Sequence, residues 1–312
     1  MLDHKKDYKA WIYIGIPLVI IAVFTIYPII YTFLVSIAVQ YDAASLTFGN
    51  YWGFFSYYRV ITNSVFLTAI TNTLILVIVS VPITTALSLF IAVLLNSIKP
   101  LQKIFQFIFF LPYVTNTLAL GMVFAVLFRW TMFPELGGMG LINTLFGLNT
   151  NWVGIGAPRS NWMLVVIIYQ VWMGLAFRIL VFMGGLQSIG KQYYDAAKID
   201  STPPKRVLTR ITIPLLSPIL AFIIITAFIG AFQTSDSILA VAGGSSPQWG
   251  IVPEDSTRWT IVHFIYNGLN QPGFTFDVSR YSMAAAGAVL LFIVILIITG
   301  INLYVSKKRV HF

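Results

Sequence analysis

Residues 193–206 read Tyr193-Tyr194-Asp195-Ala196-Ala197-Lys198-Ile199-Asp200-Ser201-Thr202-Pro203-Pro204-Lys205-Arg206, a polar and basic segment between two strongly hydrophobic stretches. Of the 312 residues of the chain, 58% are hydrophobic and only 9% are charged, whereas about 25% are charged in typical soluble proteins. The chain is therefore predicted to be an all-α integral membrane protein. The segment, which has its own helical signals, is predicted to be a cytoplasmic loop that docks to another protein.

The hydrophobic stretches set the number of membrane crossings. A bilayer core of about 30 Å requires about 20 mostly apolar residues in each spanning helix. Six stretches meet this requirement, at residues 11–38, 66–95, 104–128, 162–187, 216–240 and 282–305. We interpret residues 1–312 as a single transmembrane domain, with the loop 188–215 between its fourth and fifth helices.

The basic residues indicate the orientation. Thirteen of the lysines and arginines fall in the termini and loops of one side, and five fall on the other side. Because loops rich in Lys and Arg remain in the cytoplasm, both termini and the loop 188–215 are predicted to be cytoplasmic. The net charge of +9 therefore reflects membrane topology, and nucleic-acid binding is not indicated, since the basic residues are scattered over several loops.

Sites for metal or enzyme chemistry are not expected. The chain has no cysteine, and its three histidines, His4, His263 and His311, lie far apart in the sequence. Paired carboxylates within the spans, the HExxH motif and a nucleophile with a nearby histidine are all missing. We therefore expect a transport subunit, with no metal and no cofactor bound by this chain.

Residues 185–191 resemble a nucleotide-binding motif. They match the first seven positions of a Walker A loop, but Gln192 stands where Ser or Thr must ligate magnesium. The stretch also follows a membrane helix instead of a buried strand, so a phosphate cradle is not expected. ATP and magnesium are therefore expected on partner subunits.

The loop 188–215 reads as two short helices joined by a turn. Five residues share one helical face: Ile189, Tyr193, Ala196, Ala197 and Asp200. The two alanines allow a partner surface to approach closely, and Asp195 and Lys198 form a polar pair at the rim. Thr202 and Pro203 are predicted to be the N-cap and first residue of a second helix, from about 203 to 212.

These residues resemble a known family. The loop is similar to that of binding-protein-dependent ABC importer permeases, which carries Glu-Ala-Ala, then a glycine and later Ile-x-Leu-Pro. The matching stretches are Asp195-Ala196-Ala197, Ile199-Asp200, Ile211–Pro218, Ile26-Tyr27-Pro28, Phe109-Phe110-Leu111-Pro112, Gly184–Ile189, Asp236-Ser237-Ile238 and Gly243-Gly244. Within the family, the chain looks most like the carbohydrate-uptake class, of the maltose and glycerol-phosphate permease type.

The resemblance implies a fold, a function and partners. The fold is that of a type I ABC importer permease, with a cytoplasmic helix-turn-helix coupling loop. The function is import of a sugar or related polar solute across a prokaryotic plasma membrane. The partners are a second permease subunit, two ATP-binding cassette ATPase subunits and an extracellular solute-binding protein. The residues expected to couple the ATPase are Tyr193, Asp195, Ala196, Ala197, Asp200, Ser201 and Thr202.

The loop departs from the family pattern at two places. Asp195 replaces glutamate, and Ser201-Thr202 replaces Gly-Ala at the turn. Glycine adopts positive φ at little cost. Ser201 therefore either carries modest strain or the turn has a different geometry.

Polar residues within the spans are the candidates for the solute path: Gln170, Trp172, Arg178, Gln233, Thr234 and Asp236. A charge inside the bilayer is costly and needs an explanation. Arg178 either snorkels or bonds backbone carbonyls, or it lines the path; Asp236 either caps structure near Gly243 or lines the path. Counting from the span ends places the two charges at different depths, so we do not expect them to pair.

Two further predictions concern segments on the extracellular side of the membrane. Residues 39–65 form an aromatic-rich segment suited to the headgroup region. Residues 258–269 suggest a short interfacial helix, with Trp259 and His263 among its membrane-facing residues.

An ion- or proton-coupled secondary transporter is the alternative function. It would require an intramembrane carboxylate at mid-depth or an inverted repeat, and only Asp236 is available. A membrane-embedded enzyme is a third, weaker reading. The identity of the solute is not encoded in any single motif.

Overall fold

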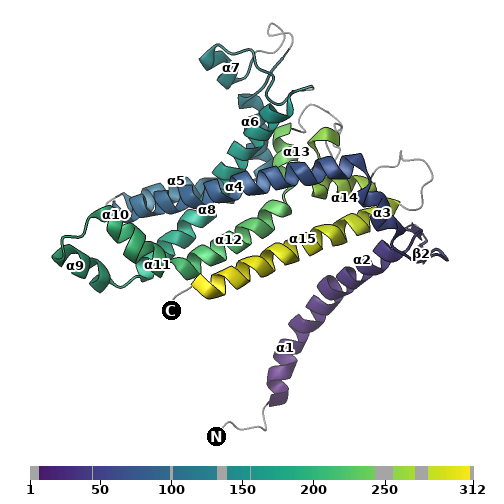
Figure 1. The fold of residues 1–312 in the computed structure, drawn as a ribbon, viewed down its shortest axis with the longest axis horizontal. Helices are drawn as coiled ribbons and strands as arrows, with labels where there is room; N and C mark the ends of the chain where they lie inside the picture. The colour runs from purple at the N-terminus through teal and green to yellow at the C-terminus, as the bar shows by residue number, and fades with distance from the viewer. Residues whose placement is uncertain are drawn as a thin grey trace. The chain divides into compact units, whose positions relative to one another are not determined.

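The computed structural model describes residues 7–43, 45–98, 101–131, 139–154, 156–242, 256–270 and 280–309, which are mostly helical (Figure 1). The chain divides into two compact units. One consists of Met1–Leu67 with Phe264–Phe292, and the other of Thr68–His263 with Ile293–Phe312.

The first unit begins with a long apolar helix. Its parts are α1 (Asp7–Ile21), a π-helical turn η2 (Ala22–Ile26) and α2 (Tyr27–Ile37), followed by the hairpin of β1 (Tyr41–Asp42) and β2 (Thr47–Phe48) and by α3 (Phe55–Ile61). The two strands are antiparallel, with Tyr41 opposite Phe48. Phe48 stacks on Trp52 with ring centroids 5.3 Å apart, so the aromatic residues of this segment hold the hairpin together as well as covering its surface.

The second unit contains the remaining long helices. In chain order the elements from residue 64 to residue 242 are α4 (Ser64–Ser97), α5 (Gln102–Val114), α6 (Thr117–Leu127), α7 (Leu141–Phe146), α8 (Arg159–Ser188), α9 (Lys191–Ile199), α10 (Pro204–Val207), η4 (Leu208–Thr212), α11 (Ile213–Leu215), α12 (Ser217–Phe232) and α13 (Asp236–Ala242). After them come η5 (Ser256–Arg258), α14 (Ile261–Asn270) and α15 (Arg280–Arg309). Helices α4, α14 and α15 contribute residues to both units.

The apolar lengths agree with six crossings. Among the described residues, four helices are long and apolar enough to span a membrane: Tyr13–Ile37, Ser64–Ser97, Arg159–Ser188 and Arg280–Lys307. Two bent helix pairs raise the number to six if each pair is one span. The prediction of an all-α membrane protein is confirmed, and the six predicted spans lie within the range of four to six that these helices allow.

The predicted span 104–128 consists of two helices in the structure. Helix α5 ends at Val114, α6 begins at Thr117, and the two are bent by 96°. Between them Thr115 is extended, with ψ of 151°, and the Asn116 side chain accepts hydrogen bonds from the backbone nitrogens of Leu118 and Ala119 at 2.9 and 3.2 Å. Asparagine is a strong N-cap, so it starts a new helix inside an otherwise apolar run.

The predicted span 216–240 is also interrupted. Helix α12 ends at Phe232 and α13 starts at Asp236. The residues between them are Gln233, Thr234 and Ser235, whose side chains favour caps and turns over helix interiors. The break therefore exposes polar side chains and backbone groups in the middle of a hydrophobic stretch.

The interfacial helix predicted at 258–269 is present, but it begins later and its environment differs. The structure has α14 at Ile261–Asn270. Trp259 and His263 are buried within the protein and do not face headgroups. A short apolar periodicity has the same appearance whether its face meets lipid or other helices, which explains the error.

The second helix of the loop 188–215 starts one residue later than predicted. Helix α10 begins at Pro204, and Pro203 is its extended N-cap residue, with ψ of 146°. A proline disfavours helical conformation in the residue before it, so the second proline of the pair takes the first helical position. Thr202 is therefore not the N-cap.

Candidate functional site

The turn between α9 and α10 is a helix-ending motif built around Ser201. The backbone nitrogen of Thr202 donates to the oxygen of Ala197 at 2.9 Å, and that of Ser201 donates to Lys198 at 3.0 Å. These two bonds define a Schellman motif, whose C′ residue is left-handed. Ser201 has φ of +48°, so a serine occupies the left-handed position, which glycine adopts at lower cost.

A substitution at this turn tests the strain. Ser201→Gly is expected to raise the stability of the folded protein by about 0.5–1 kcal/mol, because a non-glycine residue is disfavoured at positive φ. Ser201→Val, with a β-branched side chain at the same φ, is expected to lower it by about 1–2 kcal/mol. Thermal unfolding in detergent gives both values. Equal midpoints for the three proteins would contradict the left-handed turn.

The exposed face of α9 differs in part from the face inferred from spacing. Tyr193, Ala196 and Asp200 are exposed as expected. Ala197 is buried, at 6% exposure, whereas Ile199 is 85% exposed. Ala197 therefore packs against other residues of this chain, and the apolar side chain of Ile199 lies on the exposed face of α9.

The loop is also tied to the helix that follows it. The Tyr194 hydroxyl lies 3.3 Å from the Thr212 hydroxyl of η4, and Asp195 pairs with Lys198 at 3.5 Å on the surface. Behind α9 is a hollow of about 320 Å³, lined by residues that include Asn96, Ala197, Thr202 and Val207. Side chains as well as the turn therefore connect α9 to η4.

A polar cavity lies between the long helices of the second unit. Its volume is about 560 Å³. Five of the six candidates for the solute path line it, namely Gln170, Arg178, Gln233, Thr234 and Asp236. The sixth, Trp172, packs against Phe124 with ring centroids 5.4 Å apart and belongs to an apolar cluster.

The cavity also contains hydroxyl groups that the sequence analysis did not select. These residues are Ser80, Thr84, Tyr113, Thr117, Tyr169, Ser235 and Ser237. Ser80 and Thr84 lie one helical turn apart in an apolar span, which is the signal that was available in the sequence. Tyr113, Thr117 and Tyr169 come from other helices, and only the fold brings them to the same wall.

The end of the cavity at α13 carries amide and carboxylate groups. The Gln170 side-chain nitrogen donates to the Ser237 hydroxyl at 3.1 Å. Among the described residues, the Gln170 side-chain oxygen is buried without a hydrogen-bond partner. The Ser235 hydroxyl donates to the Asp236 carboxylate at 3.1 Å, and the carboxylate lies in the first turn of α13, where the helix dipole favours negative charge.

Arg178 lies further along α8. Its Nη1 atom donates to the carbonyl oxygen of Gly174 at 2.8 Å. Within the ranges that the structure describes, no ion pair joins it to Asp236, although both residues line the cavity.

A buried polar clamp connects α4 to the break between α12 and α13. The Asn72 side-chain nitrogen donates to the oxygens of Thr257 and Trp259, both at 2.8 Å, and the Thr260 hydroxyl donates to the oxygen of Thr234 at 3.4 Å. The same hydroxyl lies 2.7 Å from Nδ1 of His263. Burial lowers the pKa of His263 to about 4, so this imidazole is neutral at physiological pH.

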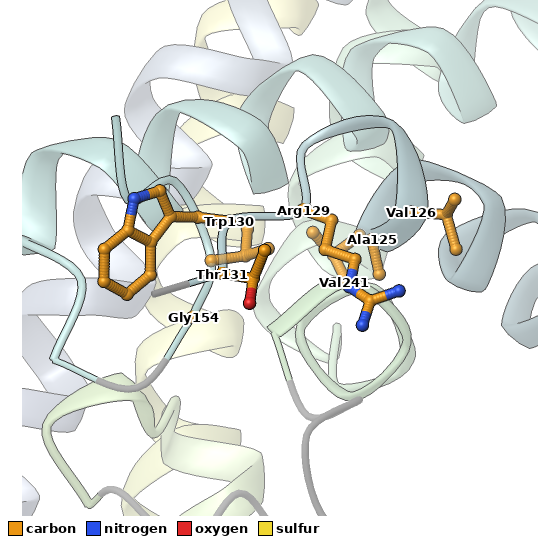
Figure 2. A pocket seen from close by; sticks show the side chains of 8 residues that line it. Ala125, Val126, Arg129, Trp130, Thr131, Gly154 and Val241 are labelled. Atoms are coloured by element: carbon orange, nitrogen blue, oxygen red, sulfur yellow. The ribbon is translucent and has the colours of Figure 1, made fainter. Parts of the chain in front are cut away.

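A second hollow, of about 460 Å³, lies where α6 ends (Figure 2). Arg129, Trp130 and Thr131 line it together with Val241 of α13. The Trp130 indole donates to the Asn149 side chain at 2.9 Å. The buried Arg258 donates to the backbone oxygen of Val153, which also lines this hollow, at 2.9 Å.

The described residues contain no group of three or more His, Cys, Asp or Glu side chains that could hold a metal ion. The polar cavity is lined by hydroxyl, amide and aromatic groups, together with the guanidinium of Arg178 and the carboxylate of Asp236. Such groups bind a polar solute by hydrogen bonds and stacking.

Comparison with known proteins identifies relatives over nearly the whole chain. The family described as binding-protein-dependent transport system inner membrane component matches residues 84–311. The lactose transport system permease protein LacF of Rhizobium radiobacter is 27% identical over 312 residues, covering 99% of this chain and 97% of that protein. The arabinooligosaccharides transport system permease protein AraP of Bacillus subtilis is 29% identical, covering 91% and 84%.

The solved structures agree with this in fold. A chain of a bacterial alginate ABC transporter, in complex with an alginate pentasaccharide-bound periplasmic protein, superposes with a TM-score of 0.78. It is 19% identical, and the match covers 97% of this chain and 96% of that chain. The similarity establishes the type I permease fold.

Proposed function

We propose that this chain, which belongs to the family of binding-protein-dependent transport system inner membrane components, carries a sugar or related polar solute through the polar cavity of its second unit. The chain is a multi-pass membrane permease of an ATP-driven importer. Relatives named for lactose, arabinooligosaccharides and trehalose/maltose transport support a carbohydrate as the solute.

The observation that carries the proposal is the lining of the cavity. Hydroxyl and amide side chains from four different stretches of sequence, α4, the α5–α6 bend, α8 and the α12–α13 break, meet around one space of about 560 Å³. Hydroxyl-rich solutes are bound by such groups because each sugar hydroxyl both donates and accepts hydrogen bonds.

The loop between α8 and α12 is proposed to be the coupling element to which the ATPase subunits bind. Tyr193, Ala196, Ile199 and Asp200 form the exposed docking face, while Ala197, Thr202 and the Tyr194–Thr212 contact connect it to the spans. In this scheme the partners are a second permease subunit, two ATPase subunits that hold ATP and magnesium, and an extracellular solute-binding protein. This chain itself catalyses no reaction and binds no cofactor.

The orientation is proposed from the distribution of basic residues. With both termini and the α9–α10 loop in the cytoplasm, the docking face meets the ATPase on the side where ATP is present. The membrane is proposed to be a prokaryotic plasma membrane, because the relatives above come from the bacteria Rhizobium radiobacter and Bacillus subtilis.

Reconstitution tests this function. Vesicles containing the full importer, with radiolabelled lactose, maltose or arabinotriose and the cognate binding protein outside and ATP inside, are expected to accumulate at least one sugar. Vesicles with the permease subunits alone are expected to show none. Uptake by the permeases alone under an imposed ion gradient would instead establish the secondary-transporter alternative, and it would refute the proposal.

A further inference from the structure

Arg178 is an intramembrane cation whose position the proposed function does not explain. It lies ten residues before Ser188, the last residue of α8, which is about 15 Å from that end of the helix. A guanidinium in an apolar span is costly unless it is satisfied or serves a function. Four explanations are available: snorkelling to the membrane surface, an ion pair, a structural bond to a backbone carbonyl, or a role in the cavity. The bond to the Gly174 carbonyl oxygen is present, but it uses one of the five N–H donors of the guanidinium and leaves the charge on the cavity wall.

Snorkelling is excluded by the direction of the side chain. An arginine that snorkels extends toward the nearer aqueous surface, which here is the Ser188 end of α8. Instead, Nη1 bonds the carbonyl of Gly174, one turn toward the opposite end. The side chain therefore points away from the nearer end of the helix and into the cavity that it lines.

The helix is shaped to receive the guanidinium at this place. A Cβ atom on Gly174 would lie 2.2 Å from Nη1 of Arg178 and 3.0 Å from the Thr84 side chain. A side chain at residue 174 would require the guanidinium of Arg178 or the Thr84 side chain to shift. The guanidinium of Arg178 is therefore held at one level of the cavity by its place beside Gly174 and by its hydrogen bond to the Gly174 carbonyl oxygen.

Arg178 forms no ion pair within 4.0 Å with another described residue. The ion pair of Lys198 with Asp195 lies on the surface loop and does not involve α8. Asp236 belongs to the other end of the cavity, since its neighbour Ser237 bonds Gln170, one helical turn beyond Gly174. A cation that crosses the cavity therefore passes the guanidinium of Arg178, to which no carboxylate is bonded.

From these observations we infer that Arg178 is a charge filter, which keeps the cavity impermeable to protons and small cations and admits uncharged or anionic solutes. A fixed positive charge in a confined path of low dielectric repels cations strongly. At a separation of several ångströms and an effective dielectric constant of about 20, the repulsion lowers cation passage by a factor on the order of 10 to 100. The inference rests on the proposed function, because it requires the cavity to be the path.

The test is a leak measurement on the whole importer without solute or binding protein. Vesicles carry the wild-type complex, Arg178→Gln or Arg178→Lys, with a pH-sensitive dye inside, and a valinomycin-driven potassium potential draws protons inward. The nucleotide-free and the vanadate-trapped complexes are both measured. Arg178→Gln is expected to raise the proton leak about tenfold or more in at least one state, whereas Arg178→Lys, which keeps the charge, is expected to stay near wild type.

Two outcomes overturn the inference. One is a leak of Arg178→Gln equal to wild type in both states, with assembly of the complex confirmed by size-exclusion chromatography. The other is a leak of Arg178→Lys as large as that of Arg178→Gln, which would make the shape of the guanidinium, and not its charge, responsible. Failure of the wild-type importer to accumulate sugar with ATP would refute the proposed function instead, so the two failures are distinguishable.

Discussion

Replacing Ile199 by aspartate is expected to lower sugar-stimulated ATPase activity of the reconstituted importer about tenfold or more. Ile199 is the most exposed large apolar side chain of α9, at 85%, and under the proposed function it is buried against the ATPase. A carboxylate there would be desolvated without a partner, and central interface residues carry most of the binding free energy. The measurement is phosphate release by vesicles with and without the binding protein and sugar.

The matched control is Thr209→Ala. Thr209 is exposed on the same loop, but it lies in η4, and its hydroxyl donates to the backbone oxygen of Lys205 in the preceding α10. This variant is expected to keep the wild-type activity. Full coupling in Ile199→Asp, with the complex intact, would contradict a docking role for α9 and would leave the polar cavity as the remaining support for the function.

Replacing Gly121 by leucine is expected to destabilise the second unit by about 3 kcal/mol or more. Even a Cβ atom at this position of α6 would lie 2.0 Å from the Cβ of Ala240 and 3.0 Å from its Cα. The clash involves backbone, so α6 and α13 must move apart, and overpacking of this kind costs about 1–3 kcal/mol per site or more. Thermal unfolding of the detergent-solubilised protein measures the loss.

Gly184→Leu is the control for this experiment. Gly184 also lies inside a helix, α8, but a Cβ atom there meets nothing within 4 Å. Because leucine is a better helix former than glycine by about 1 kcal/mol, the control is expected to be neutral or slightly stabilised. A Gly121→Leu protein as stable as Gly184→Leu would show that α6 and α13 are not packed closely at this point.

The charge filter and the sugar path use different features of one cavity. Hydrogen-bonding groups at Gln170, Thr234 and Ser237 offer binding to a hydroxylated solute, and the guanidinium of Arg178 excludes cations. A path wide enough for a sugar is also wide enough for hydrated ions, so an importer needs a means of discrimination by charge. The neutral side chains alone do not supply it.

Sequence reasoning located the loop and most of the polar candidates, and its errors have a common cause. The helix breaks at Asn116 and at Gln233–Ser235 lie inside stretches that are hydrophobic on both sides of the break. A count of consecutive apolar residues therefore does not detect them. Trp172 shares α8 with Gln170, yet it turns into an apolar cluster, because the direction of a side chain on a helix acquires meaning only when its neighbours are placed. Tyr113 and Thr117 were missed for the same reason.

The amino-acid sequence by itself determined the membrane character of this protein, its apolar stretches, the position of the polar loop 188–215 and the family. These follow from apolar length, charge distribution and local motifs, which are properties of one stretch of chain at a time. The tertiary structure decided that Ala197 turns inward while Ile199 faces outward, that the α12–α13 break forms part of the cavity wall, and that Arg178 points into the cavity. Those features depend on which helices pack together, and packing joins residues that are far apart in the sequence.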